Sequence, residues 1–134
     1  MMCVQAATDA ETGALILTVD AEGLERLVDL LQAPPLAAVP LTRALEYAAT
    51  RPIGALHLAR SSDDALVIAT DGEAAIITGS PAGFARLARR LREFADYNDL
   101  SEPGMHVHID PGDHSGAVLA QGSRSLIVAG PVPG

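Results

Sequence analysis

Residues 80–95 read SPAGFARLARRLREFA and carry the clearest secondary-structure signal in the 134-residue chain. Ser80 is a favoured helix N-cap, and Pro81 suits the first helical position, where a backbone N–H would have no helical partner. The apolar residues that follow recur at helical spacing, so the stretch predicts an amphipathic helix with one buried face. The residues expected on that face are Phe84, Leu87, Ala88, Leu91 and Ala95.

A second amphipathic helix is expected upstream, where Asp20 can cap residues 21–31 and Pro34-Pro35 ends the helix. Its first residues, AEGL at 21–24, align with PAGF at 81–84, an offset of 60. The predicted buried face of this helix consists of Leu24, Leu27, Val28 and Leu31.

Strands are expected around these helices. The dipeptide Asp71-Gly72 favours a tight hairpin between residues 66–69 and 74–78, because glycine adopts a positive φ at little cost. Another hairpin is predicted between residues 55–59 and 66–69, connected through residues 61–64. The remaining expected elements are strands at 14–19, 105–109, 117–120 and 124–129, and a helix from Pro40 to about Pro52.

These elements predict one α+β domain that spans residues 1–134. Its halves, about residues 14–70 and 73–130, are interpreted as duplicated β-α-β-β units. The two helices are expected to pack side by side on one face of a mainly antiparallel sheet and to share one core. The strand segments taken as equivalent are residues 66–68 with 126–128 and residues 56–58 with 107–109.

The composition bounds the class of partner. With 49% hydrophobic and 19% charged residues the chain is expected to fold into a globular protein. All nine basic residues are arginine, against 17 acidic residues, which gives a net charge of −8. This charge disfavours nucleic acid and anionic membranes as partners and favours a basic protein. The acidic residues expected at exposed helix or turn positions, and therefore at a partner-binding surface, are Asp20, Glu22, Glu25, Asp29, Asp63 and Asp64.

The N-terminal sequence lacks a basic region followed by a long apolar run, and no run of about 18 apolar residues occurs later. We therefore expect a soluble cytoplasmic protein. Cys3 is the only cysteine, so it cannot form an intrachain disulfide, and we expect it to be a thiol in a disordered terminal segment.

A histidine cluster is the sharpest candidate for chemistry. On a strand, His106, His108 and Asp110 would share one face, and two imidazoles with a carboxylate could bind zinc or iron, with Asp113 and His114 as further donors. The Pro-Gly turn directly after Asp110 would hold a metal poorly, so we interpret the cluster as a polar strand face and keep a metal-binding protein as the least favoured alternative. Sequence motifs for nucleophilic catalysis and for phosphate binding do not occur. The sequence therefore predicts no enzyme, no cofactor and no metal.

The C-terminal half carries a longer pattern. A glycine opens an amphipathic helix, Gly-x-His-x-His-hydrophobic-Asp follows, and Leu-x-x-Gly-Ser-x-x-Leu with two more hydrophobic residues comes last. Over about residues 73–130 this pattern resembles the immunity protein thirty-two family of bacterial polymorphic toxin systems, from which it departs in a longer, more polar loop around residues 113–115. The matching residues are Gly83, Gly104, His106, His108, Asp110, Leu119, Gly122, Ser123, Leu126, Ile127 and Val128.

The resemblance implies a small, non-catalytic α+β protein that binds and neutralises a partner toxin inside the producing cell. The arginine-only, alanine-rich composition suits a high-GC bacterium such as an actinomycete. The order of strands and helices also resembles one domain of a DNA sliding clamp, which is itself a duplicated unit. A homo-oligomeric structural or scaffolding module is therefore the alternative, although a likeness of fold does not imply function.

Overall fold

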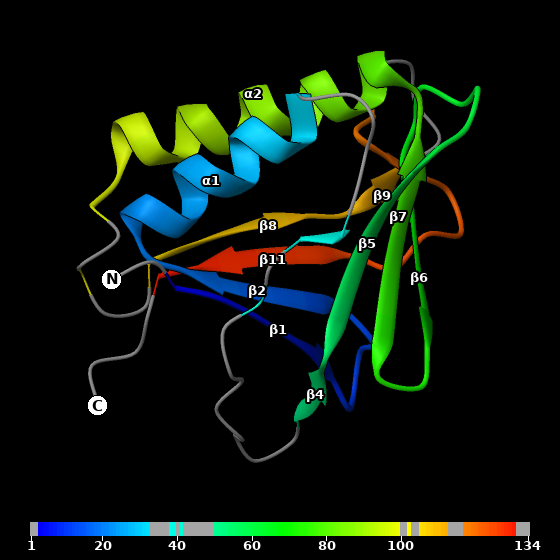
Figure 1. Ribbon diagram of the computed structural model, residues 1–134, viewed down its shortest axis with the longest axis horizontal. Helices are drawn as coiled ribbons and strands as arrows, with labels where there is room; N and C mark the ends of the chain where they lie inside the picture. The colour runs from blue at the N-terminus through cyan, green and yellow to red at the C-terminus, as the bar shows by residue number, and fades with distance from the viewer. Residues whose placement is uncertain are drawn as a thin grey trace.

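The computed structural model describes residues 3–32, 38–39, 41, 50–99, 102, 105–112 and 117–130. Two helices lie side by side over sheets of mostly antiparallel strands (Figure 1), which confirms the predicted α+β class. The helix predicted from Pro40 to about Pro52 falls largely on residues 42–49, which lie outside the described residues. Its predicted last turn is wrong, because the chain from Thr50 forms a strand, β4 (Thr50–Ile53).

Both helices begin where the sequence predicts. α1 (Ala21–Gln32) follows Asp20, whose carboxylate accepts the amide of the third helical residue at 2.7 Å. α2 (Pro81–Tyr97) follows Ser80, whose hydroxyl accepts the amide of its own third residue at 3.1 Å. Each cap pairs an N–H group that the geometry of a helix start leaves without a backbone partner.

The apolar faces of the helices enter one core, and they agree with the prediction except at the end of α2. Ala95, which was predicted on the buried face, is exposed, and Phe94, which was not included in that face, is buried. The Phe94 ring is large enough to join the core, whereas the Ala95 methyl group borders a groove between the two helices. The predicted face residues that are buried are Leu24, Leu27, Val28, Leu31, Phe84, Leu87, Ala88 and Leu91.

The strands of the described residues are β1 (Val4–Asp9), β2 (Leu15–Val19), β3 (Ala38–Val39), β4 (Thr50–Ile53), β5 (Ala55–Arg60), β6 (Val67–Asp71), β7 (Ala74–Gly79), β8 (His106–Ile109), β9 (Pro111–Gly112), β10 (Leu119–Ala120) and β11 (Leu126–Ala129).

These strands form two larger sheets and one short pair. The five-stranded sheet has the order β4-β1-β2-β11-β8, and its neighbours are antiparallel except β2 and β11, which run parallel with Leu15 opposite Leu126. The four-stranded sheet has the order β3-β5-β7-β6, with β5 and β7 parallel. β9 and β10 make a parallel pair.

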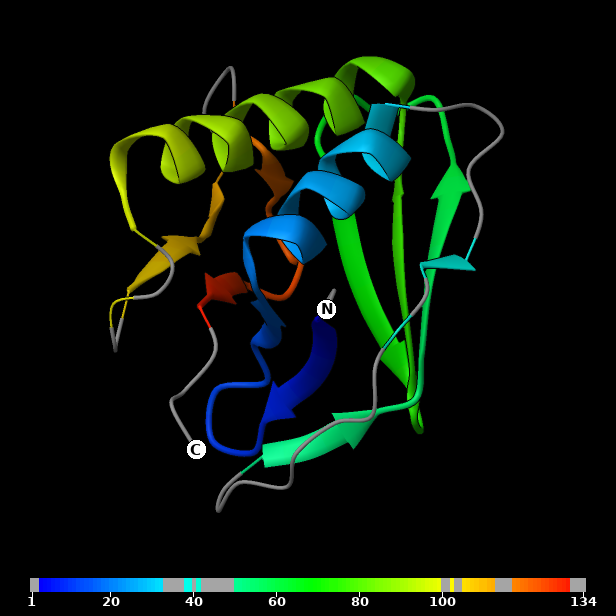
Figure 2. The ribbon, with the colours of Figure 1, turned by 60° about the vertical axis from the view of Figure 1, so that its left-hand side comes forward.

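The expectation of a single sheet under both helices is wrong. α1 contacts β1 and β2 of the five-stranded sheet, and α2 contacts β7 of the four-stranded sheet. In Figure 2 the green strands of the second sheet stand beside the first sheet, below the helices. Strands twist relative to their neighbours, so an array of this size wraps a compact core more readily as two sheets than as one.

The predicted hairpin of β5 with β6 is also wrong, because β7 lies between these two strands. The connecting segment crosses the end of β7, where the Ser61 amide donates to the Gly79 carbonyl at 2.9 Å and the Ser80 amide donates to the Asp63 carbonyl at 2.8 Å. The predicted β6–β7 hairpin is confirmed, with Gly72 at φ +61° in its turn. A local sequence pattern can identify two adjacent strands but cannot show that a third strand inserts between them.

The N-terminal segment is better ordered than expected. Residues 4–9, for which no element was predicted, form β1, and the N–H and carbonyl of Cys3 both bond to Asp20, at 3.0 Å and 3.3 Å. The expectation that Cys3 lies in a disordered segment is therefore wrong. Gly23 is needed here, because a β-carbon at this position would meet the Cys3 carbonyl.

The predicted internal duplication stays a prediction. The start of α2 has the same kind of close backbone contact as the start of α1. A β-carbon at Gly83 would meet the Asp64 carbonyl, and a β-carbon at Gly23 would meet the Cys3 carbonyl. The sheets do not support the predicted equivalence of residues 66–68, around the start of β6, with residues 126–128 in β11, because these two segments have different neighbouring strands. β11 lies parallel beside β2, and the strand parallel beside β7 is β5 rather than β6.

Candidate functional site

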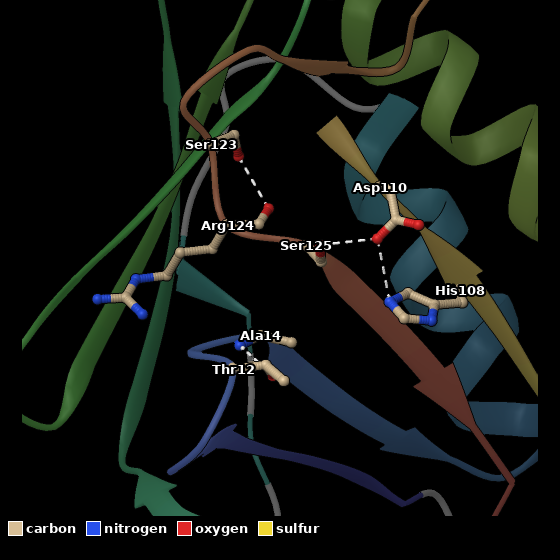
Figure 3. Close-up of polar contacts among 7 residues, drawn as sticks. All are labelled: Thr12, Ala14, His108, Asp110, Ser123, Arg124 and Ser125. Atoms are coloured by element: carbon tan, nitrogen blue, oxygen red, sulfur yellow. Dashed lines mark hydrogen bonds and ion pairs between the residues drawn. The ribbon is translucent and has the colours of Figure 1, made fainter. Parts of the chain in front are cut away.

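The strand face with the histidines ends in a small polar cluster (Figure 3). The His108 Nε2 lies 3.1 Å from the Asp110 Oδ1, and the Ser125 hydroxyl donates to the same oxygen at 2.8 Å. His106 and His108 are exposed and lie opposite Ala129 and Ile127 of β11. The two histidines therefore share one face of a strand, as predicted. Asp110 connects His108 to Ser125, the residue before β11.

The chemistry open to this cluster is limited by its connectivity. In a nucleophilic triad the imidazole lies between the hydroxyl and the carboxylate, so that it can take the hydroxyl proton. Here the carboxylate lies between Ser125 and His108. The side chains of His108 and Asp110 are 50% and 69% exposed, so no pocket excludes water from them. This arrangement does not activate a serine.

The alternative interpretation of the cluster is a metal-binding site. Across the described residues, no group of three or more His, Cys, Asp or Glu side chains is placed to hold a metal ion. His108 and Asp110 contact each other rather than framing an open coordination site. Asp113 and His114, the further donors considered, lie outside the described residues.

The glycine and serine of the C-terminal pattern have a structural role. Gly122 has φ +92°, a conformation that favours glycine, and turns the chain into Ser123. The Ser123 hydroxyl accepts the Ile68 amide of β6 at 2.9 Å and donates to the Arg124 carbonyl at 3.0 Å. The Leu66 amide donates to the Val118 carbonyl nearby, at 2.8 Å. The segment from residue 118 to residue 124 thus joins the five-stranded sheet to the edge of the four-stranded sheet. Gly104 of the same pattern lies outside the described residues.

The six acidic residues predicted for partner binding fall into two groups. Asp63 and Asp64 lie at the start of α2, where the Asp64 carboxylate accepts the Ser80 hydroxyl at 2.6 Å. Because the helices run antiparallel (Figure 1), this point is at the opposite end of the helix pair from Asp20 and the start of α1. The structure therefore does not bring the six residues into one patch.

Three of the other four predicted acids border a groove between the first turns of α1 and the last turns of α2. The groove has a volume of about 690 Å³. Asp20, Glu25 and Asp29 line it from the α1 side, whereas Glu22 is exposed on α1 outside it. Asp96 and Asp99 line it from the α2 side, and sequence reasoning missed both. Only the antiparallel packing of the helices brings the end of α2 to the start of α1, and no spacing within either helix shows this.

The arginines of α2 stay mostly on its outer surface. The Arg89 Nε lies 3.8 Å from the Glu93 carboxylate one turn later. Arg92 reaches α1, where it donates to the Gln32 side chain at 3.1 Å rather than to an acid. No helix in the described part of the chain is long and apolar enough to span a membrane.

No curated protein and no solved structure matches the chain. The family model of immunity protein 32 matches residues 75–131. The match begins in β7 and includes α2, β8, the polar cluster around Asp110 and the Gly122-Ser123 turn. The match falls on the same C-terminal half whose motif suggested this family, so this part of the chain is similar to immunity protein 32.

Proposed function

We propose that this chain is an immunity-like protein that acts as a single domain in the cytoplasm of the producing cell and neutralises a partner toxin by binding it. The observation that carries the proposal is the match of residues 75–131 to the immunity protein 32 family. Neutralising a toxin by binding it requires a recognition surface rather than catalytic groups.

The charge of the chain supports this proposal. A net charge of −8 speeds the approach of a positively charged partner, and the exposed acids of α1 provide a local attractive surface. Long-range attraction of this kind is weakened by salt, because the Debye length falls to about 8 Å near physiological ionic strength. The polar cluster at Asp110 fits the proposal too, since its connectivity offers no activated nucleophile.

Co-expression with the effector encoded beside its gene tests the proposal directly. We expect the chain to restore growth of cells that express the effector and to form a complex with it that elutes as one species in gel filtration. The association rate is expected to fall as salt is raised. Unrelieved toxicity with no complex would refute the proposed function.

Self-association is the second candidate function, and one observation favours it. Val67 and Ile76 are exposed on the outer face of the four-stranded sheet, where Ile76 lies between His57 and Ala69 on the neighbouring strands. An exposed apolar face can pair with a second copy. Light scattering on the purified chain tests this candidate, and a monomer at high concentration rejects it.

A further inference from the structure

The groove between α1 and α2 combines an apolar floor with an acidic rim. Its floor includes Leu24 and Val28 of α1 and Ala95 of α2. Five carboxylates line it, from Asp20, Glu25, Asp29, Asp96 and Asp99, against one guanidinium, from Arg92.

The lining groups differ in how far they are already engaged. The Asp20 carboxylate accepts the amides of Cys3 and Gly23, and Arg92 donates to Gln32, so both serve the fold. Glu25, Asp29 and Asp96 are exposed, and within the described part of the chain none of them is bonded to a basic side chain. Three carboxylates around an apolar floor are thus open to a partner.

The end of α2 adds to this negative potential. The C-terminal carbonyls of a helix carry a partial negative charge that favours cations nearby. The last turn of α2 contains no basic residue that could balance it. The positive end of α1, which also borders the groove, is already balanced by Asp20 and by Glu22 in the first turn. The net effect is a site for positive charge.

We infer that the groove binds an arginine- or lysine-bearing segment of a partner protein, an assignment that rests on the proposed function and specifies its recognition site. The long basic side chains have an aliphatic stem and a cationic head. In this groove the stem would lie over Leu24, Val28 and Ala95, and the head would pair with Glu25, Asp29 and Asp96. A nucleic acid does not fit, because its phosphates would meet these carboxylates.

The site can be tested without knowing the toxin. The probe is a short amphipathic peptide of alanine, leucine and arginine, and the control peptide carries glutamine in place of each arginine. Titrated into isotopically labelled protein, the arginine peptide is expected to shift the amide resonances of residues around the groove, such as Leu24, Val28 and Ala95. The glutamine peptide is expected to leave them in place.

A pair of matched double variants separates local recognition from general charge attraction. Asp29→Asn with Asp96→Asn removes two rim charges, and Glu11→Gln with Asp71→Asn removes two exposed charges outside the groove lining. Both reduce the net charge equally. We expect the rim variant to weaken peptide binding about fivefold or more, and the control variant to weaken it less than about twofold. Equal weakening by the two variants would overturn the assignment, as would resonance shifts that map elsewhere.

A steric variant gives an independent check. Ala95→Trp places a large ring over the floor from an exposed helix position, so it should block the peptide while an unchanged circular dichroism spectrum shows that the fold remains. If wild-type protein neutralises its effector and both groove variants do so equally well, the groove assignment fails and the proposed function stands. If wild-type protein binds the peptide in the groove but protects against no effector, the proposed function fails and the groove remains a binding site for basic segments.

Discussion

The hydroxyl of Ser80 donates to the carboxylate of Asp64 at 2.6 Å and accepts the amide of Gly83 at 3.1 Å. One side chain therefore caps α2 and also fixes the segment that carries the chain from β5 to β6. Ser80 is buried, so water does not readily replace its bond to the Gly83 amide, whereas the bond to the exposed Asp64 carboxylate is only partly buried. Helix start and strand crossover are thus stabilised by the same group.

Ser80→Ala is expected to destabilise the protein by about 1–3 kcal/mol, because it removes the cap and leaves the Gly83 amide unpaired. Asp64→Ala should cost less, since it removes only the outer of the two bonds. Urea denaturation of both variants measures the difference. Equal losses would mean that the cap itself contributes little.

Ser123→Ala is expected to loosen the join between the two sheets, at a cost of about 1–3 kcal/mol, because the Ile68 amide loses its acceptor. Hydrogen exchange at the Ile68 amide should accelerate. Ser125→Ala is the matched control, since its bond to Asp110 is exposed and its loss should cost under about 1 kcal/mol. Unchanged protection of Ile68 in the first variant would contradict the assigned role of Ser123.

The two helix stripes should respond to truncation as parts of one core. Leu27→Ala and Leu91→Ala are each expected to cost about 2–5 kcal/mol, because both side chains are fully buried and leave a cavity. Arg89→Ala should change stability by less than about 0.5 kcal/mol, since its contact with Glu93 is exposed. Chemical denaturation that showed comparable losses at Leu91 and Arg89 would be incompatible with this packing.

The histidine strand provides a test of the metal alternative. We expect His106→Ala with His108→Ala to leave the fold intact and to cost at most about 1–2 kcal/mol, because both side chains lie on an exposed face. Elemental analysis of protein purified without a histidine tag should find no stoichiometric metal. One zinc or iron per chain that disappears together with stability in the double variant would establish a metal site.

The sequence predicted those features whose causes are local. The caps at Asp20 and Ser80, the apolar faces of both helices and the Asp71-Gly72 turn each depend on neighbouring residues, and all are present. β1 was missed because its inward positions, Val4, Ala6 and Thr8, include a small and a polar side chain, which give a weak alternation signal.

The failures concern contacts between distant segments. The insertion of β7 between β5 and β6 has no signature in any of the three strands. The acids of the groove were predicted only on α1, because Asp96 and Asp99 join them through antiparallel packing of the helices. The family motif pointed to Gly122 and Ser123 without revealing that they connect two sheets.

The parallel pairing of β2 with β11 constrains how the chain can be synthesised and folded. β11 lies between β2 and β8, so the five-stranded sheet stays divided until residues 126–129 have left the ribosome. Until then β2 presents an open edge, which is a template for pairing with another nascent chain. Folding that depends on such a late, distant partner is intrinsically slow. A stop codon just before Leu126 would therefore remove an interior strand of the five-stranded sheet rather than an edge strand, and we expect the truncated product to aggregate.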